Sequence, residues 1–130
     1  MRLLFDTSVA IALRDGDPRI LEKAAPLTPV ALISAVTAVE LESGVSRSAG
    51  GREQRRAALE ALYETLDILP FGVPEAAAYG RIVAELGFAR GLIIDRMIAA
   101  QALVAGATLV TLNARDFRAI AGLQLEDWSA

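Results

Sequence analysis

The sequence predicts an α/β fold in which helices flank one parallel β-sheet. Short apolar runs alternate along the chain with longer amphipathic segments, and this alternation is typical of parallel α/β proteins. The apolar runs are continuous, as expected for strands that are buried on both faces. The chain has 130 residues, of which 54% are hydrophobic and 22% are charged. This length and composition favour a single folded domain over residues 1–130 and argue against disorder.

Five short segments are expected to form the strands of this sheet. The first is Leu-Leu-Phe, and it ends directly at Asp6. Before the fourth strand, Gly106 ends an apolar helix. Each of the five is short, with three to six residues, as is usual for strands. The expected strands are residues 3–5, 30–34, 68–71, 107–111 and 123–128.

Helices are expected between the strands, and several begin with residues that suit a first turn. Thr7 and Ser8 can cap the first helix, and Pro18 suits the first turn of the second. Thr37 and Glu40 have the spacing of a capping box at the start of the third. Apolar residues at helical spacing mark the later helices. The expected helices are residues 9–14, 18–23, 37–47, 52–66, 74–88, 97–105 and 116–120.

The composition excludes several kinds of chemistry. The chain has no cysteine and no histidine, so disulfides, thiolate metal sites, imidazole bases and Ser-His-Asp triads are all ruled out. A protein-bound metal would have to be a hard ion held by oxygen. The net charge of −3 argues against binding nucleic acid through bulk charge, although a local basic groove remains open. No signal peptide or membrane span is apparent, and a cytoplasmic protein is expected.

Four acidic residues lie at or near expected strand ends or helix starts. Asp6 follows the first strand, and Glu40 lies one turn into the helix after the second. Asp95 sits among apolar residues, and Asp116 follows the fourth strand. Each of the four has a structural alternative as a helix cap or turn residue. Glu42 falls on a different helix face from Glu40 and is expected to be solvated.

Taken together, the four acids predict a metal site. Parallel strands end at one edge of a sheet, and that edge could gather all four carboxylates. Crowded carboxylates repel unless a divalent cation neutralises them, and Mg²⁺ and Mn²⁺ suit oxygen ligands. Such an ion would hold water and a substrate phosphate, which indicates metal-dependent phosphoryl transfer. Side chains that could orient water or phosphate at the rim are Thr7, Ser8, Thr111 and Asn113.

Four segments of the chain follow one another in a recognisable order. They are LLFDTS at residues 3–8, SAVTAVELESG at 34–44, DRMIAA at 95–100 and TLNARDF at 111–117. In this order they resemble the PIN-domain ribonucleases, and specifically the VapC-type toxins of bacterial toxin–antitoxin pairs. The resemblance covers nearly the whole chain. It implies a three-layer α/β/α PIN-like fold with a central parallel sheet of about five strands.

The same resemblance implies an endoribonuclease that depends on Mg²⁺ or Mn²⁺. Asp6 and Asp95 would be the most direct metal ligands, and Glu40 and Asp116 would complete the acidic quartet. Ser8 stands where many relatives carry asparagine. The resemblance further implies an RNA substrate, a homodimer, and a small VapB-like antitoxin whose C-terminal segment lies over the active-site groove. The polar positions beside the fourth acid are matched by Thr111 and Asn113.

A basic cluster in the middle of the chain has two interpretations. Twelve of the thirteen basic residues are arginines, which suit bidentate contacts to phosphate. The cluster could therefore contact an RNA backbone. It could equally be a solvated helix face, because acidic residues are interleaved with it. Its members are Arg47, Arg52, Arg55 and Arg56.

Three rival functions are open to a fold of this kind. A haloacid-dehalogenase-like phosphatase needs a second aspartate two residues after the first, where this chain has Ser8. A receiver domain needs an early acidic pair and a late lysine, but the only lysine is Lys23. A PIN-like fold that only binds a partner is the third, and the intact acidic set weighs against it.

Overall fold

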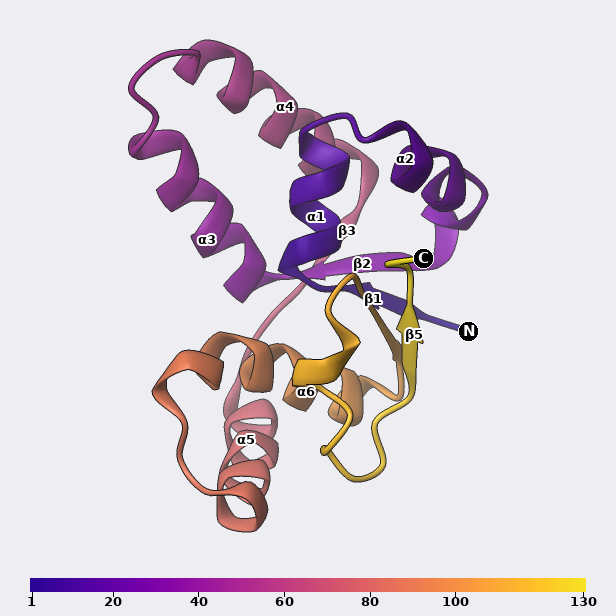
Figure 1. The fold of residues 1–130 in the computed structure, drawn as a ribbon, viewed down its shortest axis with the longest axis vertical. Helices are drawn as coiled ribbons and strands as arrows, with labels where there is room; N and C mark the ends of the chain where they lie inside the picture. Colours follow the sequence, from indigo (N-terminus) through magenta and orange to yellow (C-terminus); the bar gives the residue numbers. More distant parts are fainter.

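The computed structural model, which describes all 130 residues, has a five-stranded sheet at its centre (Figure 1). The order of the strands is β3-β2-β1-β4-β5, and every neighbouring pair is parallel. The predicted α/β fold with a parallel sheet of about five strands is therefore confirmed. The strands are β1 (Leu3–Phe5), β2 (Ala31–Ser34), β3 (Asp67–Leu69), β4 (Thr108–Thr111) and β5 (Leu125–Asp127).

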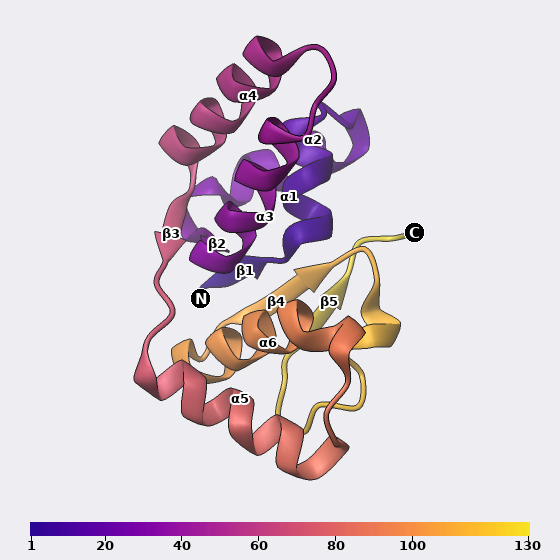
Figure 2. The ribbon, with the colours of Figure 1, turned by 90° about the vertical axis from the view of Figure 1, so that its left-hand side faces the viewer.

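Helices cover both faces of the sheet and complete the three layers. Figure 2 shows helices on both sides of the sheet. The first layer contains α1 (Thr7–Arg14), α2 (Pro18–Ala24), α3 (Ala35–Ser46) and α4 (Arg52–Thr65), and the second α5 (Val73–Leu86) and α6 (Ile93–Ala105). Three short 3-10 helices are η1 (Ala25–Val30), η2 (Arg90–Leu92) and η3 (Ala114–Asp116). None of the helices is both long enough and apolar enough to cross a membrane.

The central strand β1 divides the hydrophobic core into two halves. Leu3 and Phe5 point into the core beneath α1 to α4, while Leu4 points into the core beneath α5 and α6. This alternation follows from the two-residue period of a strand. On the first side, the Phe5 ring packs against Trp128 at a centroid distance of 5.3 Å. Both faces of β1 are thus sealed from water, and the end of this strand is held in one place.

The first helix begins differently from the prediction. Asp6, and neither Thr7 nor Ser8, is the N-cap of α1, because its carboxylate accepts a hydrogen bond from the backbone N–H of Val9 at 3.0 Å. No linker separates β1 from α1, so the residue that ends the strand also takes the cap position. The side chains of Thr7 and Ser8 are therefore free to make other contacts.

The third helix also begins earlier than predicted. Ser34, the last residue of β2, caps α3 by accepting a hydrogen bond from the backbone N–H of Val36 at 2.8 Å. The predicted capping box of Thr37 and Glu40 is therefore wrong, since Thr37 lies inside the helix and is fully buried. Both side chains point toward α1, where they contact other polar groups.

Two segments in the C-terminal half also differ from the prediction. Helix α6 begins at Ile93, so Asp95 lies in its first turn and is not its N-cap. The 3-10 turn η2 leads directly into α6, which starts the helix four residues before the position predicted. The prediction of a short helix at residues 116–120 is wrong: η3 ends at Asp116, where that helix was expected to begin, and residues 117–119 form turns.

A buried glutamine links α6 to the edge of the sheet where the strands end. Gln101 is fully buried, and its amide donates to the backbone carbonyls of Leu69 at 2.9 Å and Pro70 at 3.0 Å. Its carbonyl oxygen accepts a hydrogen bond from the Ser34 hydroxyl. Buried polar groups are costly unless they are hydrogen-bonded, and here each group has a partner. Gln101 therefore fixes α6 against the ends of β2 and β3.

Candidate active site

Asp6 lies at the centre of the candidate site, at the carboxyl end of the middle strand. Only 3% of this residue is exposed. One carboxylate oxygen accepts hydrogen bonds from the Ser8 hydroxyl at 2.5 Å and from the backbone of Val9, and the other accepts from the Thr111 hydroxyl at 2.5 Å. Burial raises the pKa of Asp6, and these hydrogen bonds act in the opposite direction. The carboxylate is therefore held in one orientation at the edge of the sheet.

The two hydroxyls that hold Asp6 also tie β1 to the loop after β4. The Ser8 hydroxyl accepts a hydrogen bond from the backbone N–H of Leu112 at 3.1 Å. The Thr111 hydroxyl accepts one from the backbone N–H of Asn113 at 2.9 Å. Each hydroxyl thus donates to the carboxylate and accepts from this loop, which keeps the loop next to Asp6.

Glu40 is held by a hydroxyl group from α1, which a second hydroxyl from α3 contacts in turn. The Thr7 hydroxyl donates to a carboxylate oxygen of Glu40 at 2.6 Å. Thr7 is also 3.0 Å from the hydroxyl of Thr37, which lies one turn before Glu40 on the same face of α3. Sequence analysis missed Thr37 as a supporting residue. Its three-residue spacing from Glu40 was the available signal, because side chains three apart on a helix are neighbours.

Asp116 is oriented by an amide from the same loop. The side-chain amide of Asn113 donates to a carboxylate oxygen of Asp116 at 2.6 Å. Asn113 is exposed, and Asp116 is half-buried at the end of η3. Hence all four polar residues singled out beside the acids contact a carboxylate: Ser8 and Thr111 contact Asp6, Thr7 contacts Glu40, and Asn113 contacts Asp116.

Asp95 differs from the other three acids because no hydrogen bond stabilises its charge. Burial, followed in order of effect by the charges of Asp6, Asp116 and Glu40, raises the pKa of Asp95 to about 6. The structure therefore brings the four acids into one electrostatic neighbourhood. The carboxylates of Asp6, Glu40 and Asp116 accept hydrogen bonds from donors within the chain, whereas that of Asp95 accepts none.

The donor set of this site suits a hard divalent cation. All of the candidate ligands are carboxylate oxygens, and their mutual repulsion is the kind that such an ion relieves. No three of the chain's Asp and Glu side chains lie close enough together to form a ready-made ligand cluster. Mg²⁺ does not need one, because it keeps several waters and takes one or two carboxylates together with substrate phosphates. Asp6 and Asp95 could provide these two carboxylates.

The metal-free protein is expected to lose stability as the pH rises. The carboxyl of Asp95 has a pKa of about 6 when folded, above its ordinary value of 3.8. Between about pH 4 and pH 6 the folded state therefore binds a proton that the unfolded state releases. The free energy of unfolding is highest below about pH 4 and falls as the pH rises through about 6. Asp95→Asn should remove this dependence, making the variant more stable than the wild type above pH 6 by about 1–2 kcal/mol after discounting for solvent screening.

Chemical unfolding with EDTA from pH 4 to pH 7.5 would measure this difference. The two proteins should have similar stability at pH 4 and diverge as the pH approaches 7. Adding Mg²⁺ should stabilise the wild type and have little effect on the variant. A difference between the two proteins that does not change with pH would contradict the electrostatic origin of the raised pKa.

The structure divides the predicted basic cluster into paired and unpaired arginines. Arg56 makes two hydrogen bonds to Glu42, at 2.6 and 3.0 Å, and Tyr63 donates a third at 2.9 Å. The prediction that Glu42 is simply solvated is therefore wrong. Arg56 and Tyr63 hold the pKa of Glu42 below its usual value. Arg52 donates to backbone carbonyls at the end of α3. Neither arginine lines the groove beside Glu40, whereas Arg47 and Arg55 do.

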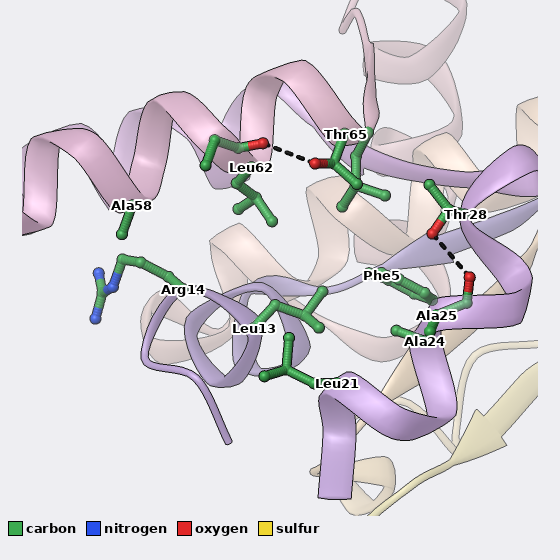
Figure 3. Close-up of a pocket in the computed structure, with 12 residues that line it drawn as sticks. Phe5, Leu13, Arg14, Leu21, Ala24, Ala25, Thr28, Ala58, Leu62 and Thr65 are labelled. Carbon is green, nitrogen blue, oxygen red and sulfur yellow. Dashed lines mark hydrogen bonds between the residues drawn. The ribbon is translucent and has the colours of Figure 1, made fainter. Parts of the chain in front are cut away.

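An apolar cavity of the protein is separate from the acids. It has a volume of about 290 Å³ and lies between α1, α2 and α4 (Figure 3). Phe5 forms part of its wall, together with Leu13 and Leu62, and none of the four acids lines it. Its wall contains no carboxylate that could hold a cation, so the reacting centre belongs at the acidic edge of the sheet.

Comparison with known proteins agrees with this geometry. Residues 3–123 match the PIN domain family. The chain is 37% identical over 131 residues to Ribonuclease VapC1 of Rickettsia felis, covering 96% of this chain and 95% of that protein. It is 31% identical over 132 residues to the tRNA(fMet)-specific endonuclease VapC of Shigella flexneri, covering 99% of both.

A solved structure supports the same assignment. The crystal structure of VapBC2 from Rickettsia felis bound to a DNA fragment from their promoter contains a chain that superposes with a TM-score of 0.88. The sequence identity is 28%, and the match covers 98% of this chain and 99% of that one. The fold, the family match and the full-length relatives together show that this chain belongs to the PIN domain family and, within it, to the VapC ribonucleases.

Proposed function

We propose that this protein is a metal-dependent endoribonuclease and the toxin of a toxin–antitoxin pair. Its active site consists of Asp6, Glu40, Asp95 and Asp116. The observation that carries this proposal is the difference among the acids. Three carboxylates are oriented by hydroxyl and amide donors. The fourth, Asp95, has a raised pKa and no donor, so its charge is the one that a cation would compensate most.

Mg²⁺ or Mn²⁺ is the ion that this set of oxygen ligands suits. Asp6 and Asp95 would hold it most directly, and Glu40 and Asp116 would complete the pocket. When bound, the ion would act as a Lewis acid on the phosphate and would lower the pKa of a water molecule. The hydroxyls of Ser8 and Thr111 contribute by fixing the direction in which Asp6 presents its oxygens.

The residues of the chain itself orient the nucleophile. Glu40 or Asp116 positions a water molecule in line with the bond to be cut, and each is held for this role by its own donor, Thr7 or Asn113. The oxygen of this water forms a bond to phosphorus and loses a proton, the bond from phosphorus to O3′ breaks, and O3′ takes up a proton. The products are a 3′-hydroxyl and a 5′-phosphate. A 2′,3′-cyclic phosphate would show instead that the ribose 2′-hydroxyl is the nucleophile.

Purified protein, freed of antitoxin, is expected to cut cellular RNA at discrete positions when Mg²⁺ or Mn²⁺ is present. The same protein in EDTA should cut nothing, because the carboxylates alone cannot stabilise charge on the phosphate. Mapping the 5′ ends of the products would identify the RNA and the cut. Release of free phosphate would indicate a phosphatase, and a stable acyl phosphate would indicate a receiver. Absence of cuts from folded protein would reduce the site to a docking surface.

A small VapB-like antitoxin is the proposed protein partner. VapBC complexes are among the solved structures that resemble this chain, and in this proposal the C-terminal segment of the antitoxin lies over the acidic groove. The four carboxylates favour an arginine or another cationic group from that segment. The active form is proposed to be a homodimer with both sites on one face. Adding the antitoxin should abolish cleavage, and light scattering of the toxin alone should give the mass of two chains.

A further inference from the structure

A polar groove adjoins the acidic site on the side of Glu40. Its volume is about 510 Å³, and Thr7 and Glu40, which belong to the site, form part of its wall. The guanidinium-bearing side chains in the wall are those of Arg14, Arg47 and Arg55. Building on the proposed function, we propose that these three arginines bind backbone phosphates of the RNA next to the one that is cut.

Arg14 is the innermost of the three arginines. It ends α1, and only 8% of its side chain is exposed. Its Nε donates to Asp15 at 3.0 Å. Nη1 lies over α3, since a Cβ atom added at Gly44 would be 3.5 Å from it. In Figure 3 the side chain of Arg14 points away from Leu13 and lies on the side of Ala58.

Arg14 could not be assigned to the groove from the sequence, because it lies more than thirty residues before Arg47 and Arg55 in the chain. A guanidinium is taken out of water only at a cost, unless charged partners compensate it. Asp15 is the one acidic partner of Arg14, and its own side chain is half exposed. The Nη groups of Arg14 make no hydrogen bond to another side chain, and they face the groove that α1, α3 and α4 form. They are therefore available to a phosphate.

Arg47 and Arg55 add charge at the outer part of the groove. Arg47 makes one long hydrogen bond, from Nε to the backbone carbonyl of Ser43 at 3.4 Å, and Arg55 takes part in none of the three salt bridges of the chain. Both are exposed. By contrast, Arg52 and Arg56 are engaged by α3. Arg47 and Arg55 thus line the groove without a salt-bridge partner, whereas Arg52 and Arg56 lie outside it.

Charge distribution explains why RNA is the ligand that fits this groove. The chain has a net charge of −3, and the four carboxylates of the site repel a polyanion. The adjoining groove has three guanidiniums and only one carboxylate. This excess of positive charge offsets the repulsion where the RNA strand enters. Arginine also matches the oxygens of a phosphate with two parallel hydrogen bonds. Because Glu40 lines both the site and the groove, a strand can run from one into the other.

The test compares Arg55→Gln with Arg52→Gln. Both residues are exposed on α4 and lose the same charge, but only Arg55 lines the groove. With a short RNA that contains one mapped cut, Arg55→Gln should raise KM about 5–10-fold and leave kcat unchanged, the effect of losing one charged contact made equally before and during the reaction. The dependence of log KM on log salt should become shallower by about 0.7. Arg52→Gln should match the wild type in both respects.

A second set of measurements protects against indirect effects. RNAs with one neutral methylphosphonate near the cut should lose affinity for the wild type at one or two positions, and Arg55→Gln should no longer sense one of them. Arg14→Lys keeps the charge but loses the planar fork, so it should raise KM while the midpoint of thermal unfolding stays within a few degrees of the wild type.

Each alternative result is distinct. If the wild type cuts RNA and Arg55→Gln has the KM and salt dependence of Arg52→Gln, the phosphate groove is refuted and the proposed nuclease stands. If Arg55→Gln weakens inhibition by the antitoxin but leaves the KM for RNA unchanged, the groove belongs to the protein partner, which also overturns the inference. If the wild type cuts no RNA with any divalent ion, the proposed function and this inference fail together.

Discussion

Asp95→Asn is expected to abolish RNA cleavage while the fold remains intact. The substitution removes a proposed metal ligand and keeps the shape of the side chain. Replacing a residue that merely orients a metal ligand already costs about 10–100-fold, so loss of a ligand should reduce kcat/KM by at least about 100-fold. The fold should tolerate the change, because Asp95 is half-buried in the first turn of α6 and no hydrogen bond supports its charge.

Initial rates on a mapped RNA with Mg²⁺ would test this expectation, with Glu22→Gln as the matched control. Glu22 is an exposed residue of α2, so this variant loses one carboxylate far from the acidic edge of the sheet and should keep its activity. Thermal unfolding of both variants without metal would show whether the fold is retained. If Asp95→Asn cleaves within about threefold of the wild-type rate, a margin of less than 1 kcal/mol, Asp95 is not a metal ligand.

Phe5→Ala is expected to cause the largest loss of stability among single substitutions near the site. Phe5 is fully buried in the central strand, packs against Trp128 and precedes Asp6 directly. Removing a buried phenylalanine typically costs about 3–5 kcal/mol. Here the upper part of this range is expected, because Phe5 already forms part of the wall of the 290 Å³ cavity and its removal would enlarge that space. The free energy of unfolding, measured with denaturant in EDTA, would show the effect.

Phe88→Ala is the natural control for this measurement. It makes the same chemical change at a residue that is 66% exposed, in the loop between α5 and α6. Its effect should lie within about 0.5 kcal/mol of zero. A loss below about 1 kcal/mol for Phe5→Ala would mean that the surrounding helices close over the space, and that the core beside Asp6 is far more plastic than its burial indicates.

The acids were predictable because they follow simple local signals. Asp6 comes directly after an apolar strand, and a parallel sheet brings the residues after its strands to one edge. The same reasoning located Glu40 and Asp116 close to Asp6, and all three raise the pKa of Asp95 in the structure. The alternative of a helix cap also holds for Asp6, since one carboxylate oxygen caps α1 and the other meets Thr111.

Contacts between distant parts of the chain were not predictable. Thr37 had the spacing of a cap, yet it is buried against Thr7, thirty residues earlier. Glu42 was expected in solvent because it falls on a different helix face from Glu40, but Arg56 and Tyr63 of α4 meet it there. Helix periodicity shows which face a side chain occupies, but the identity of the group that meets this face depends on how the helices pack.

The amino-acid sequence by itself determined the layered α/β fold, the parallel sheet and the four acids gathered at its edge. These properties follow from patterns of two or 3.6 residues and from residues placed next to strand ends, which are local and additive along the chain. Only the tertiary structure decided which acids have donors, why Asp95 has none, and which arginines share a groove with Glu40. Hydrogen bonding and electrostatic interaction act over a few ångströms in space, and residues far apart in the chain satisfy or compete for the same charge once it has folded.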